Sequence, residues 1–147
     1  MSPDITTCAA LSDLNARFAW AVDRHDWAAL AEILTPDVRY ISVDRELHGR
    51  DAVLASFRQR PSGRTTRHGL GNLLLNGQAD GTVLGLGSWH TFARNSDAVL
   101  GVPLYMVADF TDRYARDDNG TWRIAERRIT PVFRDDALAP LPGTADQ

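Results

Sequence analysis

The first part of the chain places its apolar side chains at the spacing of helices. Between residues 5 and 23, apolar positions recur every three or four residues, as on one buried helix face. These positions are Leu11, Leu14, Phe18 and Val22. A second helix is predicted over 27–34, with Asp26 as its N-cap, because a carboxylate there accepts hydrogen bonds from free backbone N–H groups. A third helix is predicted over 51–60.

The later part of the chain follows the pattern of strands. VRYISV (38–43) predicts an early strand, and DRELHGR (44–50) predicts a turn. Turn sequences then separate four long strands, predicted at about 66–76, 82–94, 102–116 and 121–133. Because these strands are consecutive, antiparallel pairing is favoured. Helices followed by such a meander predict an α+β fold, in which the helices cover one face of a curved antiparallel sheet and enclose a pocket.

Length and composition favour one domain with a short tail. The chain has 147 residues, of which 44% are hydrophobic, enough for a single core. We predict one domain over 1–135 and a partly mobile tail over 136–147, rich in Pro, Ala and Asp. Leu138 and Leu141 of this tail are candidates to close over the mouth of the pocket.

Charge and targeting signals exclude several classes of protein. The net charge is -3, and the 16 basic residues are all arginines spread along the chain, so we expect no nucleic-acid partner. The N-terminus lacks a basic region followed by an apolar run, and no stretch approaches the ~20 apolar residues of a membrane span. We therefore expect a soluble, cytoplasmic protein without a membrane partner.

The motifs of metal and cofactor sites do not occur in the sequence. There is no HxH, HExxH or Cys/His spacing, and the lone Cys8 cannot form an internal disulfide. GLGN and GLGS lie inside predicted strands and not before a helix, where a phosphate-binding loop would lie. We expect no metal and no cofactor.

Asp23 and His68 are the candidates for acid–base chemistry. Asp23 lies at the C-terminal end of the first predicted helix, where the helix dipole disfavours an anion, so it either meets an arginine such as Arg24 or serves in a pocket. His68 lies in the strand TRHGLGNLLLNG (66–77), and alternation puts Asn72 on the same side. A carboxylate can hold an imidazole in one tautomer and tune it as a general base. The alternative is a core or exposed histidine without a catalytic role.

Further polar candidates come from the other strands. His90 faces His68 if the hairpin between their strands has an even register and points away if it has an odd one. Adjacent residues of a strand face opposite ways, so only one of Arg127 and Arg128 can face a cavity, where it would neutralise a buried aspartate or bind an anionic group. For three of the four residues Asp109, Asp112, Arg127 and Arg128 we expect pairing on the surface.

Four sequence blocks together resemble a known family. They are FAWAVDRHDWAALAEILTPDVRY, HGRDAVLASF, TRHGLGNLLL and DRYARDDNGTWRIAERR. In order and spacing they resemble the SnoaL-like branch of the nuclear transport factor 2-like fold, from about Leu11 to Phe133. This resemblance implies a cone of helices wrapped on a curved antiparallel sheet. It also implies a homodimer or homotrimer that associates through the open face of the sheet.

The resemblance extends to enzymes similar to scytalone dehydratase, bile-acid dehydratase and hexachlorocyclohexane dehydrochlorinase. It implies that Asp23 and His68 act as a catalytic dyad, with His68 removing a proton while a leaving group departs. Such dehydratases often carry a tyrosine five residues before the aspartate, but this chain has Phe18 there. Tyr40 or Tyr105 is a candidate to replace it from a strand.

These observations predict a cofactor-independent lyase or isomerase that acts on a small apolar, cyclic substrate. His90, Asn72 or a tyrosine would stabilise the oxyanion that His68 generates. Candidates for the apolar wall, or alternatively for plain core, are Phe18, Trp20, Trp27, Phe57 and Trp89. One alternative is a non-catalytic ligand-binding or dimerisation module. Another is a polyketide cyclase or epoxide hydrolase, which would need Asp109 and either Arg127 or Arg128 to point inward together.

Overall fold

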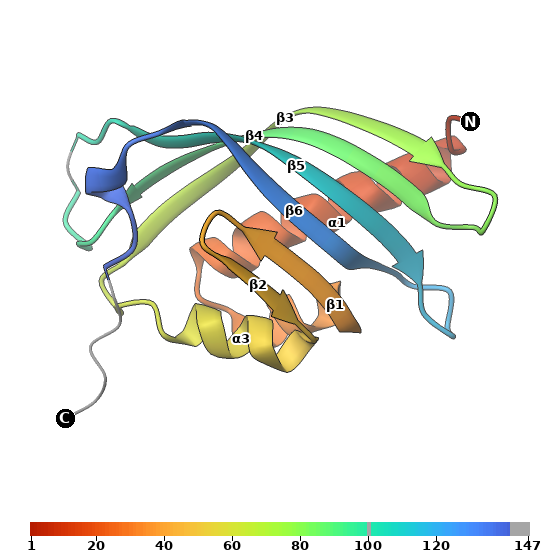
Figure 1. Ribbon diagram of the computed structural model, residues 1–147, viewed down its shortest axis with the longest axis horizontal. Coiled ribbons are helices and arrows are strands. Elements are labelled where there is room, and N and C mark those ends of the chain that lie inside the picture. Colours follow the sequence, from red (N-terminus) through yellow and green to blue (C-terminus); the bar gives the residue numbers. More distant parts are fainter. Residues whose placement is uncertain (100, 142–147) are drawn as a thin grey trace.

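The computed structural model describes residues 1–99 and 101–141, and it contains the predicted helices and long strands (Figure 1). The helices are α1 (Ile5–Asp23), α2 (Trp27–Ile33), α3 (Arg50–Arg58) and the short 3-10 helix η1 (Asp136–Leu138). The strands are β1 (Leu34–Ser42), β2 (Arg45–His48), β3 (Thr65–Gly77), β4 (Val83–Arg94), β5 (Leu104–Arg116) and β6 (Trp122–Arg134). Residues 142–147 of the predicted tail lie outside the described residues.

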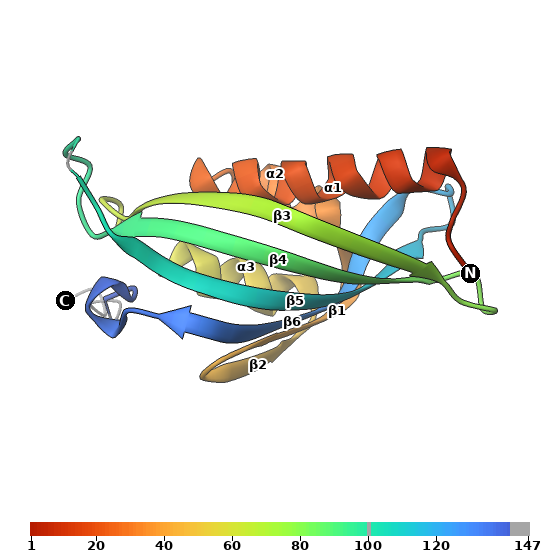
Figure 2. The same cartoon turned by 90° about the horizontal axis from the view of Figure 1, so that it is seen from above.

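The strands form one curved sheet in the order β2-β1-β6-β5-β4-β3. The four long strands pair antiparallel with their neighbours in sequence, as predicted. Helix α1 runs along β3, while α3 packs on β1 and β2, so the helices cover one face of the sheet (Figure 1 and Figure 2). The predicted α+β cone is therefore confirmed.

Strands β1 and β2 differ from the prediction. Strand β1 pairs in parallel with β6, so the sheet is mixed and not purely antiparallel. The segment predicted as a turn over 44–50 contains β2, which forms a hairpin with β1. The predicted second helix is one residue too long, because β1 already begins at Leu34. Thr35 precedes Pro36, and a residue before proline is disfavoured in the helical conformation.

The core lies between the helices and the inner face of the sheet. The four apolar positions of α1 are all buried there, and Leu30, Val53 and Phe57 of the other helices join them. The sheet contributes Trp89, Phe110, Tyr114 and Ile124. The predicted N-cap of α2 is present, since Asp26 Oδ1 accepts a hydrogen bond from the Ala29 N–H at 2.9 Å.

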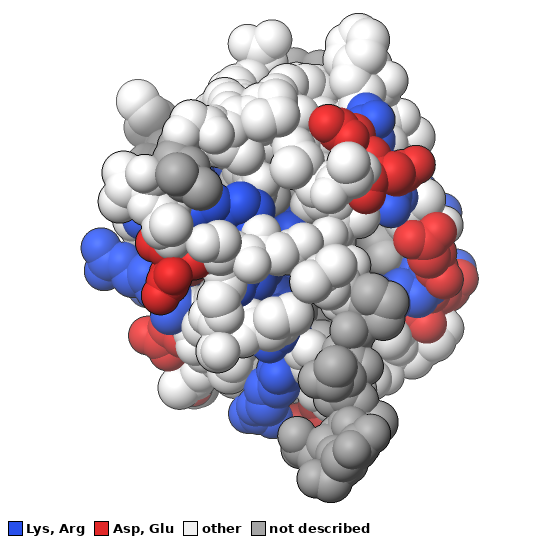
Figure 3. Space-filling model, turned by 90° about the vertical axis from the view of Figure 1, so that its left-hand side faces the viewer, with Lys and Arg blue, Asp and Glu red and all other residues white. Residues whose placement is uncertain are grey.

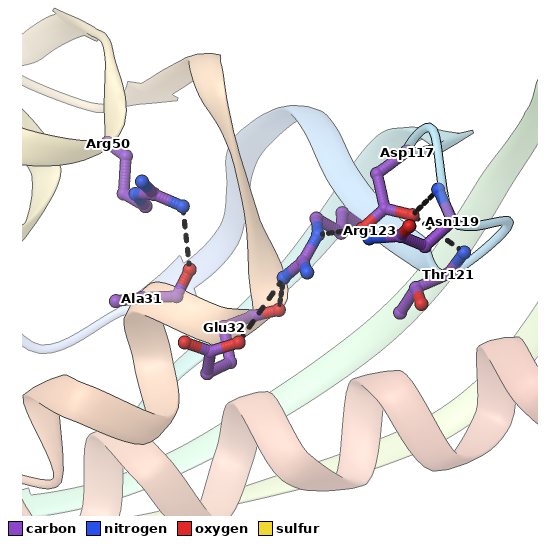
Figure 4. Close-up of polar contacts among 7 residues, drawn as sticks. All are labelled: Ala31, Glu32, Arg50, Asp117, Asn119, Thr121 and Arg123. Atoms are coloured by element: carbon purple, nitrogen blue, oxygen red, sulfur yellow. Dashed lines mark hydrogen bonds and ion pairs between the residues drawn. The ribbon is translucent and has the colours of Figure 1, made fainter.

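A polar cluster fixes α2 to the sheet at the start of β6 (Figure 4). Arg123 Nε donates to Asp117 Oδ2 at 2.9 Å, and the same guanidinium donates to the backbone carbonyl of Glu32 at the end of α2. Arg50 at the start of α3 donates to the carbonyl of Ala31. The last turn of α2 thus has partners from both the β5–β6 hairpin and α3, which holds the helical layer in place over the sheet.

Candidate active site

A cavity of about 420 Å³ lies between the helices and the sheet. Its apolar wall consists of Phe18, Val22, Phe57, Met106, Phe110 and Ile129. Polar groups project into the same space from β1, β3, β4 and β5, namely Tyr40, Thr66, His68, Thr91 and Tyr105. The end of the described chain, Ala139 to Leu141, lines the cavity as well. A pocket with an apolar wall and a few convergent polar groups is typical of small-molecule sites.

Asp23 and His68 are in direct contact at the edge of this cavity. The Nδ1 atom of His68 lies 2.6 Å from Asp23 Oδ1, and the backbone N–H of His68 donates to Asp23 Oδ2 at 3.0 Å. Both side chains are nearly excluded from solvent: 10% of the His68 side chain and 3% of the Asp23 side chain are exposed. Asp23, the last residue of α1, thus contacts His68 on the inward face of β3.

Thr66 completes the environment of the carboxylate. Its hydroxyl donates to Asp23 Oδ1 at 2.8 Å, and its side chain is buried. Sequence reasoning missed this residue, although a signal was present. Thr66 lies two positions before His68 on the same strand, so alternation places both on one face.

The pKa shifts of the pair favour a neutral imidazole. Burial raises the pKa of Asp23, but the hydrogen bonds and positive charge of His68 outweigh it, with Thr66 adding to the effect, so the pKa lies below its usual value. Burial lowers the pKa of His68 despite the Asp23 carboxylate, and the positive charges of Arg60 and Arg127 lower it further. At neutral pH the carboxylate can only accept, so the imidazole proton lies on Nδ1.

The second ring nitrogen of His68 is therefore available as a base. Nε2 has no hydrogen-bond partner within residues 1–99 and 101–141, and the ring lines the cavity. His68 also borders a second space of about 390 Å³ between α1 and β3, which Asp23 lines together with Trp20 and Trp89. Asp23 does not line the first cavity, so His68 is the member of the pair that a molecule bound there would contact.

Both candidate tyrosines line the cavity. Tyr40 of β1 is buried, and burial raises the pKa of its phenol, which keeps it protonated. Tyr105 of β5 is also buried and lies beneath the guanidinium of Arg64. Each phenol can donate a hydrogen bond to an oxygen of a bound molecule.

Asn72 and His90 do not face the cavity. A β-bulge interrupts the pairing of β3 and β4 between Leu70 and Leu73, which shifts the alternation by one residue and leaves Asn72 exposed on the outer face. His90 pairs with Gly69, while Thr91 pairs with His68, so the register is odd and His90 is exposed as well. The prediction that either residue lies beside His68 is therefore wrong.

The aromatic candidates divide between cavity and other packing. Phe18 and Phe57 line the cavity, as predicted for its apolar wall. Trp20 is 51% exposed, with Arg24 stacked on its ring, and Trp27 packs on Phe57 outside the cavity. Trp89 is buried in the core and stacks on Phe110. The three tryptophans do not form the wall of the larger cavity.

Asp112 of β5 and Arg127 of β6 form a buried ion pair, which is one of the two roles that the sequence left open for an inward-facing arginine. Arg127 donates to both carboxylate oxygens of Asp112, at 2.8 and 2.6 Å, and also to Asn15 of α1. Tyr114 donates to the same carboxylate at 2.7 Å. The prediction that only one of these four charged residues is buried is wrong, because Arg127 neutralises a buried Asp112.

Asp109 and Arg128 are exposed on the outer face of the sheet. They therefore cannot join Arg127 in an inward-facing cluster of the kind that the cyclase or hydrolase alternative requires. Within the described residues, no group of three or more His, Cys, Asp or Glu side chains could hold a metal ion. None of the described helices is both long and apolar enough to cross a membrane.

Comparison with solved structures places this chain among NTF2-like or cystatin-like folds. A type 2 hexachlorocyclohexane dehydrochlorinase, LinA, is 21% identical with a TM-score of 0.74, and the match covers 97% of this chain and 94% of that one. A scytalone dehydratase-like protein from Novosphingobium aromaticivorans is 15% identical with a TM-score of 0.76, covering 97% of both chains. Aln2 from a Streptomyces species is 21% identical with a TM-score of 0.77, covering 93% of this chain and 96% of that one.

The search against curated proteins gave no match. The match to protein-family models, by contrast, covers most of the chain. Residues 3–128 match the SnoaL-like domain, a stretch that includes α1, the strand with His68 and the buried pair of Asp112 and Arg127. This chain therefore belongs to the SnoaL-like domain family.

Proposed function

We propose that this protein is a cofactor-independent lyase or isomerase in which His68 removes a proton from a small cyclic substrate. The observation that carries the proposal is the 2.6 Å contact between Asp23 and His68 Nδ1, with the same ring on the wall of the cavity between the helices and the sheet. This arrangement leaves Nε2 as the basic atom. A pKa below its usual value keeps the imidazole neutral, and so able to accept a proton, at neutral pH.

The residues around His68 support the same chemistry. Once the ring takes up a proton it becomes an imidazolium, and the adjacent Asp23 carboxylate stabilises that charge. A phenol of Tyr40 or Tyr105 can donate to the oxygen on which negative charge develops, or to a departing hydroxyl. In an elimination the C–H electron pair forms the new double bond as the leaving group departs with its own pair. In an isomerisation the proton returns at another carbon.

The relatives in the fold comparison fit this proposal. They include a dehydrochlorinase and a scytalone dehydratase-like protein. The apolar side chains of Phe18, Phe57 and Phe110 favour a ring as the body of the substrate. Here Phe18 takes the position at which similar dehydratases carry a tyrosine, so a phenol from a strand has to assist the leaving group.

The test is a screen of cyclic β-hydroxy ketones, followed by the absorbance of the enone that elimination produces. For a substrate found in this way, His68→Gln is expected to lower the rate by about 10²–10⁴-fold, the usual contribution of a general base. His90→Gln is the matched control, because His90 lies on the neighbouring strand but is exposed. Full activity in a folded His68→Gln protein would overturn the proposal.

A second readout detects proton removal without elimination. Cyclic ketones are incubated with the protein in D₂O, and loss of the α-proton signal is followed by NMR. Exchange that depends on His68 and not on His90 supports an isomerase. If neither exchange nor elimination occurs while the same ketones bind in the cavity, the protein is a ligand-binding module and not an enzyme.

A further inference from the structure

The cavity contains arginines that have no acidic partner. Arg60 and Arg64 both line it, and neither forms an ion pair with any residue in 1–99 or 101–141. The buried atoms Arg60 Nη1 and Arg64 Nε have no hydrogen-bond partner among these residues. Arg127, by contrast, pairs with Asp112. Of the described carboxylates, only Asp44 lines the cavity, and it is exposed and lies 3.8 Å from Arg134.

The fold holds both guanidinium groups in place. Arg60 follows α3, where its backbone N–H donates to the carbonyl of Phe57 and its guanidinium stacks at 4.5 Å on the Phe57 ring. Arg64 is only 3% exposed, and its Nη1 donates to Asn95 Oδ1 at 2.9 Å and to the Leu138 carbonyl at 2.7 Å. Its guanidinium lies over the ring of Tyr105. A planar guanidinium fixed in this way is preorganised for a planar anion.

A negative charge bound in this region would be stabilised, because two buried arginines lie there without a counter-charge. Burial lowers the pKa of Arg60 to about 10, and the positive charge of Arg64 contributes to the shift. Burial also lowers the pKa of Arg64. A charge removed from water without a counter-charge is costly, and an anion beside it offsets that cost. Figure 3 views the end of the molecule near the C-terminal segment, where arginine atoms are visible in hollows between uncharged side chains.

We propose that Arg60 and Arg64 form a subsite for a carboxylate group of the substrate. The substrate class is then a small cyclic carboxylic acid, whose ring contacts the aromatic wall while its carboxylate is held by the two arginines. This inference rests on the proposed function for its substrate, and it refines the expectation of a purely apolar molecule. A carboxylate has two oxygens that can each accept a charge-assisted N–H bond, and each of the two arginines has one buried nitrogen without a partner among the described residues.

The experiment compares benzoate with benzamide, which has nearly the same shape but no charge. Binding of each probe to the ¹⁵N-labelled protein is followed by NMR chemical-shift titration, which also shows whether the cavity residues respond. Benzoate is expected to bind at least about tenfold more tightly than benzamide, since a hydrogen bond to a charged group contributes that much. Arg60→Gln is expected to remove this preference and to leave the affinity for benzamide unchanged.

The matched control is Arg58→Gln, because Arg58 is an exposed arginine of the same segment. Equal affinities for the two probes in the wild-type protein overturn the proposal, as does benzoate that shifts no cavity residue, and neither result depends on the folding of a variant. An unchanged preference in folded Arg60→Gln overturns it as well.

The same titration in His68→Gln separates the two proposals. A preserved preference for benzoate, together with absence of turnover when the wild-type screens are repeated with cyclic ketones that carry a carboxylate, would refute the proposed enzyme and leave the carboxylate subsite intact. Turnover of uncharged ketones without any preference for benzoate would refute the carboxylate subsite and leave the proposed enzyme intact.

Discussion

Two buried carboxylates, Asp112 and Asp23, have contrasting surroundings. Asp112 is bound by the guanidinium of Arg127, a permanent charge, and by the hydroxyl of Tyr114, and neither member of the ion pair lines the cavity. Asp23 is bound by His68, a group that can gain or lose a proton and whose ring borders the cavity. The guanidinium keeps its charge near neutral pH, whereas the imidazole can gain or lose a proton there.

This difference separates a structural role from a chemical one. The guanidinium of Arg127 lies against the rings of Phe18, Trp89 and Phe110, so its contacts hold α1 and two strands together. Phe18 and Phe110 then present their other atoms to the cavity. The buried ion pair thus supports the wall of the site, and the Asp–His pair supplies its reactive atom.

Arg127→Met is expected to have the largest effect on stability. It leaves the Asp112 carboxylate buried without a counter-charge, and breaking a buried pair in this way costs about 3–5 kcal/mol of unfolding free energy. Urea denaturation followed by circular dichroism measures the loss. The neighbouring Arg128→Met is the control, because Arg128 is exposed and its substitution should change stability by no more than about 0.5 kcal/mol. Equal effects of the two substitutions would contradict a structural role for the pair.

Asp23→Asn is expected to lower turnover by about 10²-fold or more, but by less than His68→Gln. The amide can still orient the ring, yet it cannot stabilise the imidazolium. Because the Asp23 charge raises the pKa of His68, its removal should also move the acid limb of the pH–rate profile to lower pH. A lower rate with an unmoved acid limb would indicate that Asp23 only supports the fold.

The dependence of stability on pH should separate the two pairs directly. The pKa of His68 lies below its ordinary value of 6.5 in the folded protein, so the unfolded chain binds more protons as pH falls below that value. Stability is therefore lost as pH falls from about 6.5 through the folded pKa of His68, by at most about 1.4 kcal/mol per pH unit for one proton. The lowered pKa of Asp23 adds a loss only at more acidic pH, as its folded pKa is crossed.

The guanidinium of Arg127 should contribute nothing to this slope. The pKa of Arg127 is raised by Asp112 despite its burial, so its stabilisation is fully present throughout the neutral and acidic range in which arginine stays charged. Urea unfolding between pH 5 and 7 should therefore show a smaller slope for His68→Gln than for the wild type. The exposed His90→Gln serves as the control, and a slope that both variants leave intact would rule out His68 as its source.

The sequence was sufficient where the structure depends on local periodicity. The apolar spacing of α1 and the cap at Asp26 were correct, because both arise within a few residues of one element. The inward direction of one of the two adjacent arginines in β6 also followed from strand alternation. The identity of its acidic partner did not follow from the sequence, because Arg127 pairs with Asp112 through the register of β5 and β6. A pattern within one strand does not specify that register.

The errors at the site have the same origin. Asn72 faces outward because a bulge between Leu70 and Leu73 shifts the alternation of β3. His90 faces outward because the register of β3 and β4 pairs it with Gly69 and not with His68. A side chain on Gly69 would collide with the His90 ring, a contact between strands that no spacing within one strand reveals. The predicted third helix extends to Arg60, but α3 ends at Arg58, so Arg60 and Arg64 both lie in the irregular segment between α3 and β3. An arginine in the cavity and one at the surface have the same sequence context there.

The smallest expected effect concerns Thr66, whose hydroxyl donates to Asp23 as the Tyr114 hydroxyl donates to Asp112. Thr66→Val keeps the volume of the side chain but removes the hydrogen bond to Asp23 Oδ1, and two hydrogen bonds from His68 remain. A loss of about 1 kcal/mol is expected, the usual net contribution of one hydrogen bond. The variant should also raise the pKa of Asp23, since the Thr66 hydroxyl helps to lower it. Urea denaturation gives the stability, and ¹³C NMR of the carboxyl group gives the pKa.

Thr66→Ser separates the hydroxyl from the methyl group of the same side chain. If the hydroxyl is what matters, serine restores both the stability and the low pKa of Asp23, because it can donate from the same position on β3. A serine variant as unstable as the valine variant would instead assign the effect to packing of the methyl group. The position of the Asp23 carboxylate would then depend on His68 alone, whereas Asp112 has both Arg127 and Tyr114 as donors.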